Sequence, residues 1–310
     1  MAPFDHKDQP ACLAIGADAG GSKLLVRWTN GQRTMSETFP SINARGVSPE
    51  EFAELLATAF EASLDGSRVD ELTTCCVGAA GAGGSEYASR CASRLADLLD
   101  LSPARVSVRS DARIALKAAF PGDDGAIIIA GTGSGCYALS PGGKLLRSGG
   151  WGPGLEDPGS GSDIGKSAIK RLLSEVESGS ISNMGNAIAG ALSLPRASVQ
   201  SILDTFYDRE FRPASLAPIM LDLMDAGDPT ATKIIEAQCL SLARQAARLL
   251  VAAGAEQPIA MMGGLTGHQG YADCLKRALR SVLPECTVSV STRAPIEGAM
   301  DWALQGRNQS

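Results

Sequence analysis

Short apolar runs alternate with stretches whose apolar residues recur at helical spacing. The apolar runs predict strands at about 12–17, 23–29, 33–39, 72–77, 106–108, 126–130, 136–139, 258–262 and 288–291. The helical spacing predicts helices at about 48–60, 85–99, 112–119, 164–176, 232–253, 271–283 and 295–304. Between 165 and 232 the chain is expected to be mostly helical. Strands that alternate with helices in this way predict an α/β protein.

A strand, a glycine-rich turn and a second strand occur twice, first near residue 12 and again after residue 122. This repetition predicts a duplicated, two-domain architecture, although the two halves share too little sequence to prove a repeat. We expect a flexible tail at 1–11, an N-terminal domain at 12–112 and a C-terminal domain at 113–310. Whether the last helix, at about 295–305, packs back on the N-terminal domain is left open.

Composition and charge exclude several classes of protein. The 310 residues are 44% apolar and 20% charged, which is typical of a globular protein. The net charge is −6 and no more than two basic residues are adjacent, so nucleic acid is not expected as a partner. No purely apolar run exceeds five residues, too few to cross a bilayer. The polar start MAPFDHKDQP and eight cysteines without a C-x-x-C pair predict a cytoplasmic protein with reduced thiols.

The stretch DAGGSK, residues 18–23, raises the question of a phosphate site. A P-loop places lysine directly after its second glycine and continues into a helix. Here Ser22 precedes Lys23, and the apolar residues that follow predict a strand that closes at Asn30-Gly31. An ordinary glycine-rich turn and a different phosphate cradle both fit this stretch.

Two further glycine-rich turns follow predicted strands. Glycines let backbone N–H groups approach an anion, and neighbouring hydroxyl groups add donors. Three such turns at strand ends favour phosphate binding over ordinary loops. The turns are Gly20-Gly21-Ser22-Lys23, Gly131-Thr132-Gly133-Ser134 and Gly263-Gly264.

Two carboxylates are candidates for the chemistry. Asp18 ends the first strand and Asp111 follows a later one. Mg²⁺ is commonly held by one or two carboxylates together with substrate phosphates, which suits Asp18. A kinase also needs an acid to accept the proton of the attacking hydroxyl, which suits Asp111. The alternative for Asp111 is a helix N-cap.

The segment GGWGPGLEDPGSGSDIG, residues 149–165, combines Trp151 with many glycines and three acids. We interpret it as an ordered loop that lines a cleft, with Asp157 placed to bind a polyol; a flexible linker is the alternative. Asn43, after the third strand, could bind a sugar hydroxyl or be a turn residue.

The order of these motifs is familiar: DAGGSK, PSINA, RSDA, GTGSGC, GGWGPGLEDPGSG, MMGG and APIEGA. It resembles the BadF/BadG/BcrA/BcrD branch of the actin-like sugar-kinase superfamily, and within it the N-acetylglucosamine and bacterial glucosamine kinases. The resemblance extends from about 12 to 305. It implies a two-domain, ribonuclease H-like ATPase fold with a cleft between the domains, and phosphorylation of the 6-hydroxyl of glucosamine or N-acetylglucosamine by ATP.

The resemblance also implies roles for individual residues. Asp111 would be the general base, Asp18 would help to hold Mg²⁺, and a homodimer is the default assembly. ATP would contact Gly20, Gly21, Ser22, Lys23, Thr132, Gly133, Ser134, Gly263 and Gly264. Sugar would contact Asn43, Gly81, Asp111, Gly131 and Asp157.

The chain departs from the family pattern in the cleft loop. Glu156-Asp157-Pro158 stands where Gly-Asp-Glu or Gly-Asp-Gln is usual, and Ser162-Asp163 replaces bulky apolar residues. Arg113 is larger than the small residue expected after the base. These departures leave open whether the sugar carries a 2-amine, which could pair with Asp157 or Glu156, or an acetamide against Trp151.

Two other functions remain on the same fold. Some relatives are ATP-driven activators of radical dehydratases or reductases, which present cysteines around an Fe–S cluster. Cys136 raises this alternative, but the cysteine spacing does not match such a site. A non-catalytic sugar-sensing protein is the other alternative.

Overall fold

Contacts within the chain divide it into two units that are not both continuous in sequence. The computed structural model describes residues 13–21, 23–44, 46–64, 72–82, 84–122, 125–152, 155, 157–254 and 258–305. Unit 1 comprises residues 1–123 and 292–310, and unit 2 comprises 124–291. The expected tail at 1–11, Ser22 and Glu156 lie outside the described residues.

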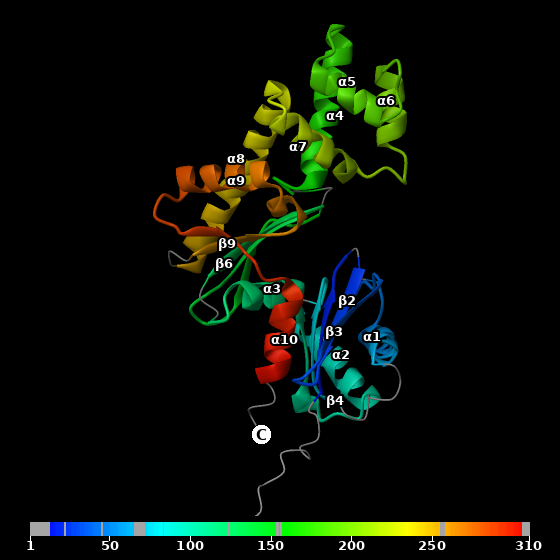
Figure 1. Cartoon of the computed structure of the whole chain (residues 1–310), viewed down its shortest axis with the longest axis vertical. Helices are drawn as coiled ribbons and strands as arrows, with labels where there is room; N and C mark the ends of the chain where they lie inside the picture. Colours follow the sequence, from blue (N-terminus) through cyan, green and yellow to red (C-terminus); the bar gives the residue numbers. More distant parts are fainter. Residues whose placement is uncertain are drawn as a thin grey trace, which may run out of the picture. The chain divides into compact units, whose positions relative to one another are not determined.

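Unit 1 is a five-stranded sheet with helices on both faces (Figure 1). The strand order is β3-β2-β1-β4-β5, in which β1, β4 and β5 are parallel and the hairpin β1-β2-β3 is antiparallel. Its elements are β1 (Leu13–Ala19), β2 (Lys23–Thr29), β3 (Thr34–Pro40), α1 (Pro49–Ser63), β4 (Leu72–Ala79), α2 (Ser85–Leu98), β5 (Val106–Ser110), α3 (Asp111–Ala119) and α10 (Pro295–Gln305).

Alternation along the strands of unit 1 separates two apolar layers. Ile15 and Ala17 of β1 pack under α1 and α2, in a core that also holds Phe52 and Phe60. Ala14, on the opposite face, packs in a smaller cluster with α3 and α10. Because side chains alternate across a strand, Asp18 shares the face of Ala14 and therefore the side of α3 and α10.

Unit 2 is built on a second five-stranded sheet of order β10-β9-β6-β7-β8. β6, β9 and β10 are parallel, whereas β6, β7 and β8 form an antiparallel meander. Its elements are β6 (Ala126–Ala130), β7 (Ser134–Leu139), β8 (Leu145–Ser148), α4 (Gly161–Ser178), α5 (Asn183–Ala191), α6 (Val199–Phe206), α7 (Ala217–Asp225), α8 (Pro229–Ala253), β9 (Ile259–Met262), α9 (Gln269–Val282) and β10 (Val288–Val290). The helices α8 and α9 pack on each other, and one apolar core joins the helices to the sheet.

The boundary between the units differs from the one that the sequence predicted. It falls after residue 123 rather than after 112, because α3 packs against α10 and belongs to unit 1. The chain also returns, since α10 contacts β1 and β4 of unit 1 (Figure 1). The hydrophobic pattern of α10 does not predict which elements the helix packs against.

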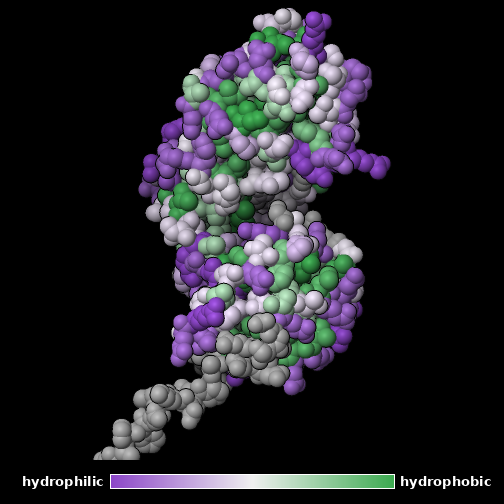
Figure 2. Space-filling model, turned by 45° about the vertical axis from the view of Figure 1, so that its right-hand side comes forward, coloured by the Kyte–Doolittle hydropathy of each residue, from purple (hydrophilic) through white to green (hydrophobic). Residues whose placement is uncertain are grey.

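Hydrophilic and hydrophobic side chains are intermixed over both units on the face of the molecule drawn in Figure 2. Seven described cysteines are free thiols, and all but Cys286 are buried. In the part of the chain that the structure describes, no helix is both long and apolar enough to cross a membrane.

Candidate active site

The first glycine-rich turn joins two strands, so it is not a Walker P-loop. β1 ends at Ala19 and β2 begins at Lys23, and the N–H of Gly20 donates to the carbonyl of Lys23 at 3.1 Å. The hydroxyl of Ser41 donates to the carbonyl of Gly20 at 2.9 Å and so ties the segment after β3 to this turn. Gly20, Gly21 and Lys23 leave the turn open to solvent.

Parallel strands bring the two candidate carboxylates to one edge of the sheet of unit 1. Asp18 lies near the end of β1, and Asp111 directly follows β5. β4 runs between them and ends in Gly78 and Ala79. A side chain at Gly78 would collide with Ile114 of α3, so the glycine allows α3 to lie close to the sheet.

Asp111 is not the N-cap of its helix. The cap is Ser110, whose hydroxyl accepts the N–H of Arg113 at 3.3 Å. Asp111 is the first residue of α3, and its Oδ1 accepts the N–H of Ala112 at 2.8 Å. A cap at Ser110 leaves the second carboxylate oxygen of Asp111 available for another partner. The alternative role as a cap is therefore wrong.

Asp18 is electrostatically strained. Its pKa is raised from 3.8 to about 6, first because burial disfavours the charged carboxylate and then because Asp111 repels it. The nearby Lys23 acts in the opposite direction. A cation bound beside the two carboxylates would reduce the repulsion between them.

The strain at Asp18 predicts a stabilising substitution. Between pH 3.8 and about 6 the folded protein keeps a proton on Asp18 that the unfolded chain has released, so stability falls as the pH rises through this window. We expect Asp18→Asn to raise the free energy of unfolding at pH 7.5 by up to about 3 kcal/mol and to have little effect at pH 4. Chemical denaturation at both pH values measures this difference.

The control for this prediction is Asp97→Asn, which changes an exposed aspartate of α2. It should leave the pH dependence of unfolding as it is in the wild type. Equal destabilisation by Asp18→Asn at pH 4 and pH 7.5 would contradict the proposed strain.

The second glycine-rich turn lies in unit 2 and is closed from two sides. The N–H of Gly131 donates to the carbonyl of Gly133 at 2.9 Å. The first turn of α4 packs against it, with the N–H of Gly161 donating to the carbonyl of Gly131 at 2.8 Å. The N–H and hydroxyl of Ser162 both donate to the carbonyl of Thr132. The carbonyl groups are thereby occupied, while Thr132 and Gly133 stay exposed.

Asp157 and Ser134 brace this turn from within unit 2. Asp157 is only 2% exposed, and its carboxylate accepts the backbone N–H groups of Ser134 and Gly152. Its pKa is nonetheless raised, because burial outweighs these hydrogen bonds. The hydroxyl of Ser134 donates to the carbonyl of Pro158 at 2.7 Å. Both side chains therefore hold the loop to the turn, and their ligand roles stay predictions.

The loop at 149–165 is shorter than expected, because α4 begins at Gly161 and includes Ser162 and Asp163. Asp157 to Ser160 are buried, so the linker interpretation is wrong for this part. Trp151 is 55% exposed and stacks on the guanidinium of Arg147, 4.5 Å from the ring centre.

The third glycine pair lies beside the second turn. β9 is parallel to β6, so Gly263 follows the strand next to the one that leads into Gly131. Gly263 has φ +103°, and a side chain there would collide with the carbonyl oxygen of Ala130. This close approach requires glycine. It also brings the backbone of Gly264 next to Gly131.

A pocket of about 370 Å³ opens at these two turns. Its polar end is formed by Gly131, Thr132 and Gly264, and its apolar wall by α7 and the residues before it. The lining residues are Gly131, Thr132, Gly161, Ala214, Ala217, Pro218, Leu221, Asp222, Gly264, Leu265 and His268. Sequence reasoning missed the residues from 214 to 222 and 265 to 268, because nothing in a helical region marks one face as a pocket wall.

The remaining predicted site residues lie in unit 1. Asn43 is exposed in the segment after β3, and Gly81 is exposed after β4 with φ +90°. In unit 1 the structure brings Asp18, Lys23 and Asp111 together; in unit 2 it groups the two glycine turns with Asp157. Among the described residues, no group of three or more histidine, cysteine or acidic side chains could hold a metal ion.

Solved structures share this fold over nearly the whole chain. A protein from Chromobacterium violaceum described as a candidate N-acetylglucosamine kinase has a TM-score of 0.72 at 21% identity, covering 95% of this chain and 100% of that one. A ROK family glucokinase from Streptomyces griseus, in complex with glucose and AMPPNP, has a TM-score of 0.60 at 19% identity, with 94% and 99% covered. The fold is that of the two-domain actin-like ATPases and sugar kinases.

The chain belongs to the BadF/BadG/BcrA/BcrD ATPase family, whose sequence profile matches residues 15–304. Among curated proteins it is 37% identical over 164 residues to the N-acetylmuramic acid/N-acetylglucosamine kinase of Clostridium acetobutylicum, covering 51% of this chain and 53% of that protein. It is 24% identical over 317 residues to the N-acetyl-D-glucosamine kinase of Dictyostelium discoideum, with 95% and 98% covered. The predicted family and fold are confirmed.

Proposed function

We propose that this protein is an ATP-dependent kinase that phosphorylates the 6-hydroxyl of an amino sugar, with Asp111 as the general base. The observation that carries the proposal is the position of Asp111, which follows β5, the parallel strand separated from the strand of the strained Asp18 by β4 alone. The family is an ATPase family, and the relatives named above are sugar kinases. Fold alone would not assign an activity, so the proposal depends on these side chains.

The acceptor side of the reaction is assigned to unit 1. One carboxylate oxygen of Asp111 accepts the N–H of Ala112, and this hydrogen bond orients the carboxylate. The other oxygen is assigned to the sugar hydroxyl. In phosphoryl transfer a carboxylate at this position orients the attacking hydroxyl and accepts its proton. Asn43 and Gly81, both exposed in the same unit, are assigned to the sugar.

Asp18 is assigned to Mg²⁺. A cation between Asp18 and the nucleotide phosphates would reverse the repulsion that raises the pKa of Asp18. When bound, Mg²⁺ would neutralise the negative charge that develops on the phosphoryl oxygens. Lys23 and the backbone N–H group of Gly21 are assigned to phosphate oxygens at the same turn. The N–H of Gly20 already donates to the carbonyl of Lys23, so the contact of Gly20 with ATP stays a prediction.

The nucleotide side is assigned to unit 2. The pocket of about 370 Å³ offers an apolar wall for the flat face of a base, and its polar end consists of glycine backbone. Gly263 and Gly264 are assigned to the adenosine, and Thr132 and Gly133 to the phosphates. Ser134 contributes indirectly, because its N–H donates to the carboxylate of Asp157 and its hydroxyl holds the loop at Pro158.

The substrate is inferred to carry an acetamide at its 2-position. An ammonium would need a free carboxylate. Of the two acids that the sequence offers, Asp157 is buried and already accepts two backbone N–H groups, and Glu156 lies outside the described residues. Trp151, in contrast, is more than half exposed and presents an apolar surface. N-acetylglucosamine is therefore the first choice of substrate and glucosamine the second. A homodimer remains a prediction.

The test is ADP release with Mg²⁺ against glucosamine, N-acetylglucosamine, N-acetylmuramic acid, N-acetylmannosamine and glucose. We expect the highest kcat/KM with N-acetylglucosamine and no turnover with its 6-deoxy analogue, because the proposal places the attacking oxygen at carbon 6. Phosphorus NMR of the product would locate the phosphate on the sugar.

Equal ADP release with and without sugar would contradict the kinase assignment, and turnover of the 6-deoxy sugar would contradict the 6-hydroxyl. The activator alternative requires cysteines at the surface, whereas six of the seven described cysteines are buried. No observation in the structure favours the sensor alternative over the kinase.

A further inference from the structure

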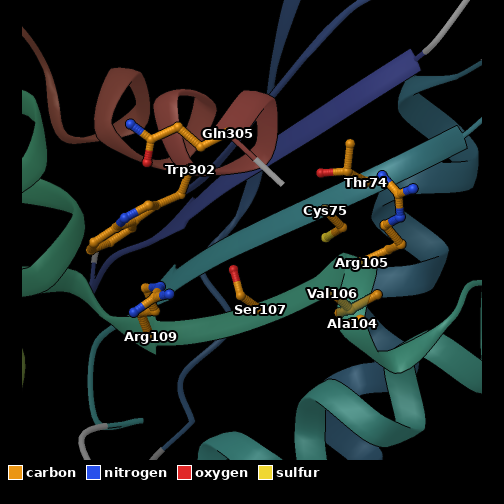
Figure 3. Close-up of a pocket in the computed structure, with 9 residues that line it drawn as sticks. All are labelled: Thr74, Cys75, Ala104, Arg105, Val106, Ser107, Arg109, Trp302 and Gln305. Carbon is orange, nitrogen blue, oxygen red and sulfur yellow. The ribbon is translucent and has the colours of Figure 1, made fainter. Parts of the chain in front are cut away.

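A second pocket lies entirely within unit 1, between the edge strand β5 and the end of α10 (Figure 3). Its volume is about 270 Å³. Its walls come from β4, β5, the turn before β5 and the last turns of α10. The lining residues are Thr74, Cys75, Ala104, Arg105, Val106, Ser107, Arg109, Trp302 and Gln305.

The pocket follows from the alternation of side chains along β5. Val106 and Val108 point into the core beneath α1 and α2. Ser107 and Arg109 point to the other face and are only half-buried. Arg105, at the end of the short helical turn Pro103–Arg105 before β5, lines the same pocket and is half-buried as well. β5 is the last strand of the sheet, so no further strand pairs with its outer edge. Polar side chains in a row on an edge strand form a binding surface rather than a core.

The charge in this pocket is positive, and one donor of Arg109 lacks a partner. Arg109 stacks on the ring of Trp302, with its guanidinium carbon 4.0 Å from the ring centre. Its Nε is buried and has no hydrogen-bond partner among the described residues. The described residues that line the pocket include no carboxylate.

The nearest titratable group does not neutralise Arg109. Cys76, on the neighbouring strand, faces Ser107 and Arg109, but burial raises the pKa of its thiol to about 11 despite these contacts. The thiol is therefore neutral at ordinary pH, and the guanidinium keeps its full charge. A buried donor that lacks a partner is costly, so an acceptor supplied by a ligand would stabilise the side chain of Arg109.

We propose that this pocket binds a small phosphorylated metabolite, with the phosphate on Arg109 and Ser107 and the rest of the molecule directed towards Arg105. Arginine is well suited to phosphate because its fork of donors matches the phosphate oxygens. Figure 3 shows Arg109 and Arg105 at opposite ends of the pocket, with Ser107 between them. Arg105 ends the helical turn before β5 and Arg109 lies four residues later in the chain, near the end of β5, so the two side chains can contact different parts of one ligand.

The pocket is also connected to the proposed catalytic residue. β5 continues from Arg109 through Ser110, the cap of α3, to Asp111. A ligand that binds Arg109 would contact the end of β5 and could thereby change the position of Asp111. This consequence rests on the proposed function, whereas the binding itself does not.

The test measures binding without nucleotide. Glucose 6-phosphate and inorganic phosphate are titrated into the full chain at low ionic strength, with calorimetry and tryptophan fluorescence as readouts. We expect saturable binding of the sugar phosphate, weaker binding of phosphate and none of glucose in this pocket. Arg109→Gln and Arg105→Gln should each weaken binding at least about tenfold, since each removes a charged donor.

The matched control is Arg33→Gln, an exposed arginine in the turn before β3, the opposite edge strand of the sheet. It should bind as the wild type does. The fluorescence change should disappear in Trp302→Phe, which separates it from the other two tryptophans. Arg105 does not stack on Trp302, so Arg105→Gln tests the pocket even where Arg109→Gln weakens the packing of α10.

Three results would overturn the proposal. They are the absence of binding, binding that both arginine variants retain, and binding that is lost in Lys23→Gln but kept in the arginine variants, which would place the ligand at the first glycine turn. Because these readouts need no turnover, a failure of the kinase assay would leave them unaffected.

Discussion

Asp111→Asn is expected to lower kcat by about 10²- to 10⁴-fold while it leaves sugar and ATP binding close to those of the wild type. The range is the usual contribution of a positioned general base. Asparagine has the same shape, and its side-chain oxygen can still accept the N–H of Ala112. Ser110 caps α3 in either case, so the helix should begin at the same residue. The substitution removes the ability to take up the proton, together with one negative charge.

A second readout distinguishes this role from a structural one. Asp111 is one of the causes of the raised pKa of Asp18, so the substitution should lower that pKa from its value of about 6. Carbon NMR titration of the aspartate carboxylates would detect the shift. The effect arises through charge alone and does not depend on catalysis.

The control is Glu51→Gln, which removes a negative charge from the first turn of α1 in the same unit. Both substitutions weaken a favourable helix-dipole interaction by a few tenths of a kcal/mol to about 1 kcal/mol. Only Asp111→Asn should reduce turnover. A kcat near that of the wild type in Asp111→Asn, with sugar present at saturation, would show that another group accepts the proton.

Gly298→Ala is expected to destabilise unit 1 by about 3 kcal/mol or more. Gly298 lies in α10 where that helix crosses α3, and a methyl group there would collide with the carbonyl oxygen of Ile114 and lie 2.7 Å from the N of Ala118. These are backbone atoms, which cannot move aside as a flexible side chain would. Overpacking typically costs about 1–3 kcal/mol, and here the helix that must shift begins with Asp111.

Denaturant unfolding and hydrogen exchange of α3 and α10 would measure this effect. The matched control is Gly190→Ala, another helical glycine, in α5, where an added methyl group meets nothing within 4 Å. Alanine is favoured over glycine in a helix by up to about 1 kcal/mol, so this variant should be as stable as the wild type or more so. Equal stability of the two variants would show that α10 does not pack on α3 as described.

Much of the fold can be predicted from local pattern. The strands that end in glycine turns, the capped helix after Ser48 and the long helix α8 all have strong periodicity and clear end signals, and each is found near its predicted position. β8 is missing from the prediction because its sequence, Leu-Leu-Arg-Ser, is neither a continuous apolar run nor an alternation of apolar and polar residues. The boundary after residue 112 was placed too early, since α3 packs on a helix that lies more than 170 residues later in the chain.

The site is predicted less completely than the fold. Asp18 and Asp111 could be selected because each stands where an apolar strand ends, and the parallel order of β1, β4 and β5 then brings them to one edge. The burial of Asp157 and the contact of Ser134 with Pro158 could not be foreseen, because both depend on a loop that folds back on the turn.

The sequence by itself determined the elements, the family resemblance and the residue types that the chemistry needs, because these are set by spacing along the chain and by local propensity. Only the tertiary structure decided that α10 returns to unit 1, that Gly263 lies against Ala130, and that Arg109 stacks on Trp302 in a second pocket. These features depend on contacts between segments far apart in the chain. Such contacts are selected by packing and burial, which no local pattern records.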